Sequence, residues 1–166
     1  MKKILALLAA FAVPAAAYAG DSLLDTMTAR WGTYVFVSTH MPRADVIELA
    51  REASLAHATV VLNGFGGDAG TLVATERFAA DINAACCGKR PAHWIIDPVL
   101  VQRYHVAAAP AFVVAHGESD NPGEYSAVSG DMSLSQALKF VAQGSQLESA
   151  RQYATQVYYS AFGNRE

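Results

Sequence analysis

The chain contains 166 residues, carries a formal net charge of −3, and is 52% hydrophobic and 16% charged. A chain of this size forms one ordinary domain and buries roughly 68–70% of its unfolded surface, so it needs neither a metal nor a disulfide for stability. Lys89 and Arg90 are the only adjacent basic pair after the N-terminal region, and without a basic stripe we expect no nucleic-acid partner.

The N-terminal region has the pattern of a secretory signal peptide. Lys2 and Lys3 precede an uncharged run from Ile4 to Val13, and Ala17-Tyr18-Ala19 offers small residues at the spacing that signal peptidase requires. We therefore predict a signal peptide over residues 1–19, whose apolar run is too short to be a stable membrane anchor. Its removal takes away two lysines and no acid, which changes the net charge from −3 to −5.

A lead-in over residues 20–33 is predicted between the signal peptide and the main domain. Leu23, Leu24, Met27 and Trp31 have the spacing of one helical face, so a short helix is expected over Asp21–Trp31. The run Tyr34–Val37 is β-branched and aromatic, which is typical of a buried strand.

A helix is predicted after that strand. Ser38 and Thr39 are capping residue types, Pro42 suits an early helical position, and Asp45 places a negative charge in the first turn. The helix is expected to end near His57.

The following segment continues with another strand and helix. Ala58–Leu62 predicts a second buried strand, and a strand, a helix and a strand at this spacing form a right-handed parallel unit. The loop Asn63–Asp68 is glycine-rich but lacks a phosphate-binding motif, so it is interpreted as a plain turn. A helix is predicted over Thr71–Ala84, with a buried face formed by Leu72, Thr75, Phe78, Ala79 and Ile82.

The stretch Trp94–Val114 is the most informative part of the chain. Trp94–Ile96 predicts a strand that ends at Asp97, and Pro98 suits the first turn of a short helix. Pro110 opens the strand Ala111–Val114 at a place where a cis peptide bond would sit. This order resembles the second half of a thioredoxin fold, which implies an α/β domain with a central mixed sheet flanked by helices. Structural roles are predicted for Pro42, Asp97, Pro98 and Pro110, and an apolar helix face for Leu100, Tyr104 and Val106.

The C-terminal part is expected to complete the domain. An antiparallel strand is predicted at Tyr125–Val128, followed by a helix that Ser133 caps and Gly144 ends. The thioredoxin-like domain is placed at residues 34–144, and the C-terminal helix within 145–166. That helix is predicted over Leu147–Phe162, with Ala150, Ala154, Val157, Tyr158 and Phe162 among its apolar residues.

Several strings together resemble the TrbC family of F-type conjugative transfer proteins. They are YVFVS at 34–38, THMP at 39–42, TVVLNGF at 59–65, IDPVLVQRYHV at 96–106 and AAPAFVV at 108–114. The resemblance implies a periplasmic protein of a type IV secretion system that is needed for pilus assembly and works with other transfer proteins, a TraW-like protein in particular. Ala109-Pro110-Ala111 departs from the Val-Pro-Thr of the family without threatening the fold.

The position of the redox site in active thioredoxin folds holds no thiol here. In those proteins a C-x-x-C pair begins the helix after the first core strand, because the helix N-terminus stabilises a thiolate. Ser38, Thr39, His40 and Met41 occupy that position, so disulfide exchange by this route is excluded and no catalytic residue is predicted. A shallow groove between this turn and Ala109-Pro110 is left, and we predict that it binds an extended segment of a partner.

Cys86 and Cys87 are the two cysteines of the chain, and three interpretations of them remain open. Adjacent Cα atoms lie about 3.8 Å apart, below the usual minimum of about 4.4 Å for a disulfide, so a bridge between them would be strained and easily reduced. The two residues form such a bridge, form mixed disulfides with a partner, or remain free thiols.

No metal or cofactor site is predicted. The remaining histidines, His57, His93, His105 and His116, are scattered, and no H-x-x-x-H or C-x-x-C spacing is present. The chain also lacks a G-x-S-x-G motif, so hydrolase activity is not expected.

Two hypotheses of function follow. The first is a non-catalytic, thioredoxin-like assembly factor that acts in the periplasm through protein contacts. The second is a thiol-disulfide oxidoreductase or redox-sensitive chaperone that uses Cys86 and Cys87.

Overall fold

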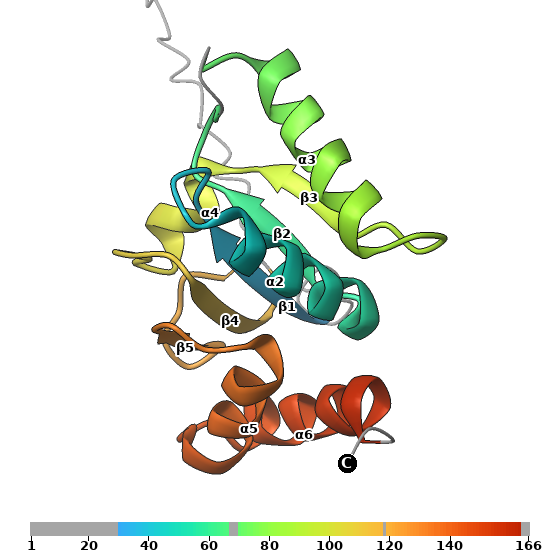
Figure 1. Ribbon diagram of the computed structural model, residues 1–166. Coiled ribbons are helices and arrows are strands. Elements are labelled where there is room, and N and C mark those ends of the chain that lie inside the picture. The colour runs from blue at the N-terminus through green and yellow to red at the C-terminus, as the bar shows by residue number, and fades with distance from the viewer. Residues whose placement is uncertain (1–29, 67–69, 118, 164–166) are drawn as a thin grey trace, which may run out of the picture.

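The computed structural model describes residues 30–66, 70–117 and 119–163, and Figure 1 shows their arrangement. The predicted signal peptide and most of the lead-in lie outside these residues. The strands are β1 (Trp31–Val37), β2 (Thr59–Leu62), β3 (His93–Ile96), β4 (Ala111–His116) and β5 (Tyr125–Ser129). The helices are α2 (Arg43–Ala56), α3 (Leu72–Cys86), α4 (Pro98–Arg103), α5 (Leu134–Gly144) and α6 (Glu148–Phe162).

The strands form one mixed sheet in the order β3-β2-β1-β4-β5. Strands β1, β2 and β3 are parallel, while β4 runs antiparallel to β1 and β5 antiparallel to β4. Val35 in β1 pairs with Val60 on one side and with Phe112 on the other. A parallel βαβ half thus joins an antiparallel ββα half, which is the thioredoxin-like α/β fold that the sequence predicts.

The two faces of the sheet carry separate hydrophobic clusters, because side chains alternate along each strand. Val35, Val60 and Phe112 belong to the larger cluster, which α2, α3, α5 and α6 cover. Phe36 and Val61 belong to the smaller cluster, in which Leu100, Tyr104 and Val106 pack as the predicted apolar face of the α4 segment.

Side-chain caps fix where three of the helices begin. Thr71 accepts the Ala74 N–H at the start of α3, Asp97 accepts the N–H groups of Val99 and Leu100, and Ser133 forms a capping box with Gln136. Pro98 is the first residue of α4, as predicted. Each cap satisfies backbone donors that the first turn of a helix leaves without a partner.

The start of α2 differs from the prediction. Pro42 itself occupies the N-cap position and makes no side-chain cap, so Ser38 and Thr39 belong to the preceding turn and do not cap the helix. Asp45 lies in the first turn, and the helix ends where His57 adopts a left-handed conformation with φ 53°.

Two other predictions are wrong in part. Trp31 is the first residue of β1, so the helix predicted over Asp21–Trp31 does not include it. Leu72 was expected to be buried but is 49% exposed, because α3 covers the β3 edge of the sheet and turns mainly Thr75 and Ile82 inward.

The buried residues of α6 are those predicted, Ala150, Ala154, Val157, Tyr158 and Phe162. Among the described residues no helix has the length and hydropathy to cross a membrane.

Candidate functional site

A hollow of about 330 Å³ lies at the carboxyl ends of β1 and β2. Three segments line it, residues 36–40 after β1, 61–66 after β2 and 106–109 before β4, together with Val101 of α4. We call this hollow the groove. It lies where parallel strands end, which is where open α/β sheets bind their ligands.

The turn Ser38–Met41 is closed by its own hydrogen bonds. The Ser38 hydroxyl accepts the His40 N–H at 3.2 Å and lies 3.3 Å from Nδ1 of the His40 ring. The Ser38 carbonyl accepts the Met41 N–H, and the Ser38 N–H points to the Met41 sulfur at 3.4 Å. The turn therefore presents a rigid backbone and small side chains to the groove.

The predicted partner-binding residues line two different hollows. The turn Ser38–Met41 and the opening of β4 at Ala109-Pro110 separate these hollows, and we call them the ridge. Ser38, Thr39, His40 and Ala109 line the groove. Met41 and Pro110 instead line a second hollow, of about 290 Å³, between α2 and the turn that joins β5 to α5. The turn and the β4 opening meet as predicted, but they separate two hollows where the sequence suggested one.

Pro110 opens β4 after a cis peptide bond with Ala109. Its carbonyl accepts the Gly130 N–H at 3.1 Å, which ties the strand opening to the end of β5. Pro110 has no N–H to offer in return, and because it lies just before β4 begins it removes no donor from the pairing of that strand.

Asp97 positions α4 beside the groove. One carboxylate oxygen accepts the N–H groups of Val99 at 2.9 Å and Leu100 at 3.0 Å, while the Asp97 N–H donates to the Leu62 carbonyl. This arrangement fixes α4 to the end of β2 and places Val101 in the groove wall.

The loop after β2 contributes more than the plain turn that the sequence suggested. Residues 63–66 line the groove, and Phe65 is 60% exposed. Gly66 lies so close to Thr39 that a Cβ atom on it would meet the Thr39 Oγ1 at 2.9 Å. The sequence signal that could have indicated a contact surface is a phenylalanine within a glycine-rich loop, because such a loop leaves a large apolar side chain exposed.

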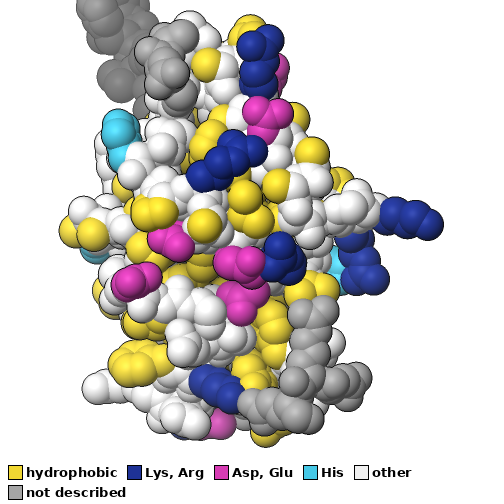
Figure 2. Space-filling model, in the orientation of Figure 1, with side chains coloured by type: hydrophobic (Ala, Val, Ile, Leu, Met, Phe, Trp, Pro, Cys, Tyr) yellow, Lys and Arg dark blue, Asp and Glu magenta, His cyan; other side chains and the backbone are white. Residues whose placement is uncertain are grey.

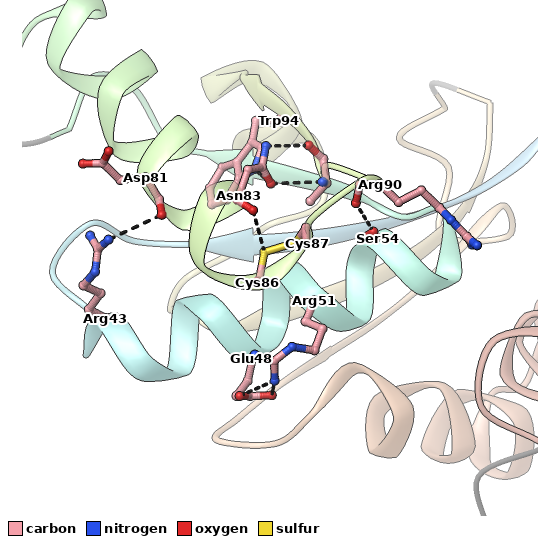
Figure 3. The surroundings of a disulfide bond; sticks show 11 residues. Arg43, Glu48, Arg51, Ser54, Asp81, Asn83, Cys86, Cys87, Arg90 and Trp94 are labelled. Atoms are coloured by element: carbon pink, nitrogen blue, oxygen red, sulfur yellow. Dashed lines mark hydrogen bonds and ion pairs between the residues drawn. A yellow bond between two sulfur atoms is a disulfide. The ribbon is translucent and has the colours of Figure 1, made fainter.

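Cys86 and Cys87 are bridged, which is the first of the three interpretations left open by the sequence. Figure 3 shows the bridge at the end of α3, over α2. Both residues are half-buried and pack against the larger hydrophobic cluster. The Cys86 sulfur lies 3.9 Å from the Asn83 carbonyl, and because a bridged sulfur carries no hydrogen this is a contact and no hydrogen bond.

No sequence pattern indicates the hydrogen bonds that hold the segment after the bridge. Asn83 accepts the Ala92 N–H at 3.0 Å and the Trp94 Nε1–H at 3.2 Å, and donates to the Ala92 carbonyl (Figure 3). Ser54 of α2 donates to the Arg90 carbonyl at 2.5 Å. The bridge thus lies in a fixed loop that leads into β3.

The bridge and the groove lie at opposite ends of the parallel strands. The groove follows the carboxyl ends of β1 and β2, whereas the loop after Cys87 leads into the amino end of β3 (Figure 1). Among the described residues no group of three or more histidine, cysteine or acidic side chains is arranged to hold a metal ion.

The chain is similar to one known protein family and to one solved structure. The family model for type-F conjugative transfer system pilin assembly proteins matches residues 35–141. Curated proteins give no match. A solved structure of a secreted Mycobacterium tuberculosis disulfide oxidoreductase, homologous to E. coli DsbE, is similar with 17% identity and a TM-score of 0.41, over 77% of this chain and 80% of that chain.

Proposed function

Because the chain belongs to the type-F conjugative transfer system pilin assembly proteins, we propose that it is a non-catalytic factor that holds segments of other transfer proteins during pilus assembly. It acts in the periplasm after removal of the signal peptide at residues 1–19, and a TraW-like protein is its foremost partner. The observation that carries this proposal is an apolar groove at the usual ligand end of the sheet, built around a turn without a thiol.

The lining of the groove favours binding over chemistry. Val101, Val106 and Phe65 supply apolar surface, and exposed backbone between residues 106 and 109 supplies hydrogen-bonding groups for an extended segment. Ser38 and His40 contact each other at 3.3 Å, but among the described residues no carboxylate lines the groove to orient the imidazole as a base. A protein segment is the ligand that this combination of apolar side chains and backbone groups suits.

A second candidate function is thiol-disulfide exchange at Cys86 and Cys87, which the presence of a bridge favours. Its location argues against this function. Cys87 is the C-cap of α3, and the negative end of a helix raises the cost of the thiolate that exchange requires. Insulin reduction by the wild-type chain is therefore expected to equal that of the Cys86→Ser, Cys87→Ser variant. Turnover above that control would support the enzyme.

Complementation of a deletion strain separates the two functions. The variant Cys86→Ser, Cys87→Ser is expected to restore pili and mating frequency at unchanged protein level. The variant Met41→Asp, Ala109→Arg, which places charges on both sides of the ridge, is expected to lose them. Loss of mating in the cysteine variant at normal abundance would instead make the bridge functional.

A matched control keeps the groove variant interpretable. Phe140→Asp with Ala84→Arg introduces the same charges at exposed positions of α5 and α3, outside the groove. This control is expected to mate normally and to capture a purified TraW-like protein as the wild type does. If the groove variant folds and also captures that protein normally, the groove is the wrong surface.

A further inference from the structure

The second hollow has an apolar floor that continues the candidate binding surface. Met41, Leu49, Pro110 and Met132 supply this floor, between α2 and the turn that joins β5 to α5. Met41 and Pro110 directly follow His40 and Ala109, which line the groove on the other side of the ridge. A segment that crosses the ridge would therefore enter both hollows.

Acidic side chains surround this apolar floor. Asp45, Glu48 and Glu52 lie three and four residues apart, so they share one face of α2, and Asp131 lies opposite them in the turn before α5. In Figure 2 acidic side chains gather around exposed hydrophobic surface in the middle of the face that α2 crosses. We call this second hollow the acidic hollow.

Two of these carboxylates are engaged within the protein. Glu52 accepts the Leu134 N–H at 2.6 Å and the Ser135 hydroxyl at 3.2 Å, and Glu48 forms an ion pair with Arg51 at 2.5 Å. Both therefore have structural partners. The Glu52 carboxylate is engaged at the start of α5, and Arg51 offsets the charge of Glu48.

The other two carboxylates, Asp45 and Asp131, remain exposed on opposite sides of the floor. Within the described part of the chain neither carboxylate makes a hydrogen bond or an ion pair. Asp45 is held on α2 and Asp131 on the turn that follows Gly130, whose N–H is bonded to Pro110. The hollow thus combines an apolar floor with two uncompensated negative charges at its rim.

We propose that the acidic hollow receives a lysine or arginine side chain of the partner segment that binds in the groove. The aliphatic stem of such a side chain packs on Met41, Leu49 and Met132, while its cationic end reaches Asp45 and Asp131 at the rim. Long basic side chains bury their stems on apolar surface and keep their charge in water, which matches this lining. The inference rests on the proposed function, and it adds that the partner segment is apolar with a basic residue at one fixed position.

Selection from a phage library of randomised short peptides, with the mature chain as bait, tests the inference. Peptides that depend on the groove are identified by their loss on the Ala109→Arg variant, whose substitution lies in the groove and leaves the lining of the acidic hollow unchanged. We expect these peptides to share a lysine or arginine at one position. Asp45→Asn with Asp131→Asn is expected to weaken their binding about fivefold and to remove the preference, since two exposed ion pairs are lost.

The control variant removes two carboxylates elsewhere. Glu76→Gln with Asp81→Asn alters exposed residues of α3 and is expected to leave the preference unchanged. Groove-dependent peptides without a basic preference, or a preference that survives Asp45→Asn with Asp131→Asn, would overturn the inference and leave the proposed function intact. A selection that yields no groove-dependent peptide would overturn both.

Discussion

The carboxylate of Glu52 in α2 accepts the backbone N–H of Leu134, the first residue of α5, at 2.6 Å. This bond spans 82 positions of sequence and satisfies a donor that the first turn of α5 leaves without an intrahelical partner. The Ser135 hydroxyl donates to the same carboxylate at 3.2 Å. Glu52 therefore joins the two halves of the fold at the base of the acidic hollow.

Replacing Glu52 by alanine is expected to destabilise the protein by about 1–2 kcal/mol, because the N–H of the buried Leu134 loses its acceptor. Glu52→Gln is expected to cost less, since its amide oxygen can still accept that N–H. Urea unfolding at neutral pH measures both. Equal losses for the two variants would show that the carboxylate charge, and not the hydrogen bond, stabilises this junction.

The pH dependence of stability should also change in Glu52→Gln. Burial raises the pKa of the Glu52 carboxyl above its ordinary value of 4.5, against the hydrogen bonds from Leu134 and Ser135 that lower it. The folded protein then holds this proton more tightly than the unfolded chain. The contribution of Glu52 to the free energy of unfolding is fully present below pH 4.5 and is lost as the pH rises through the raised folded pKa.

The wild-type free energy of unfolding, relative to that of Glu52→Gln, is therefore expected to fall as the pH rises from 4.5 toward neutrality. Urea titrations of both proteins across this interval measure the difference. Subtraction removes the contributions of other carboxyl groups that the two proteins share. A difference that stays constant or rises with pH would contradict the raised pKa.

Asn83 is expected to be one of the most sensitive polar positions of the domain. Its side chain makes three hydrogen bonds that fix the start of β3 to the end of α3, two to Ala92 and one to Trp94. Asn83→Ala should cost about 2–4 kcal/mol because it leaves those groups without their partner. Asn83→Asp keeps the acceptors and should cost less. Urea unfolding followed by tryptophan fluorescence checks the order of the two variants.

A close approach in the groove wall gives a test of its geometry. A Cβ atom on Gly66 would overlap the Thr39 Cγ2 methyl group and would lie 2.9 Å from the Thr39 Oγ1. Gly66→Ala should therefore destabilise the protein by about 1–3 kcal/mol. Adding Thr39→Gly should recover part of that loss, and thermal unfolding of the two single variants and the double variant measures the coupling. Additive losses would place these residues further apart in solution.

Removal of the Cys86–Cys87 bridge should have little effect on global stability. A bridge between adjacent residues closes no loop of chain, so reduction releases little entropy in the unfolded state. Urea unfolding with and without a thiol reductant should differ by less than about 1 kcal/mol. If the reductant lowers the free energy of unfolding of the wild type by more than this and has no effect on the Cys86→Ser, Cys87→Ser variant, the bridge is a structural support.

Features that depend on local pattern could be predicted from the sequence. Helical periodicity identified the buried residues of α6, and Ser133 marked the start of α5 because its capping chemistry acts within one turn. Pro110 likewise predicted the opening of β4. The wrong assignment of Trp31 has a similar local cause, since apolar residues at helical spacing also occur where a strand begins.

Features that depend on distant contacts could not be predicted. The bond between Glu52 and Leu134 and the acceptors of Asn83 arise only when separate elements pack. The placement of Met41 and Pro110 in the acidic hollow follows from how α2 approaches the turn before α5, which no sequence pattern encodes. Six residues of the predicted groove therefore divide between two hollows.

The unequal covering of the two sheet faces has a consequence for the lifetime of a bound segment. In the described part of the chain four helices cover the larger cluster, while α4, with six residues, is the helix over the smaller one. Val101 of α4 and Val106 after it also form a wall of the groove. Short, thinly packed elements open most often. We therefore expect the opening rate of α4 to determine how long a segment stays bound. Motion of the α2 side of the groove is expected to matter less.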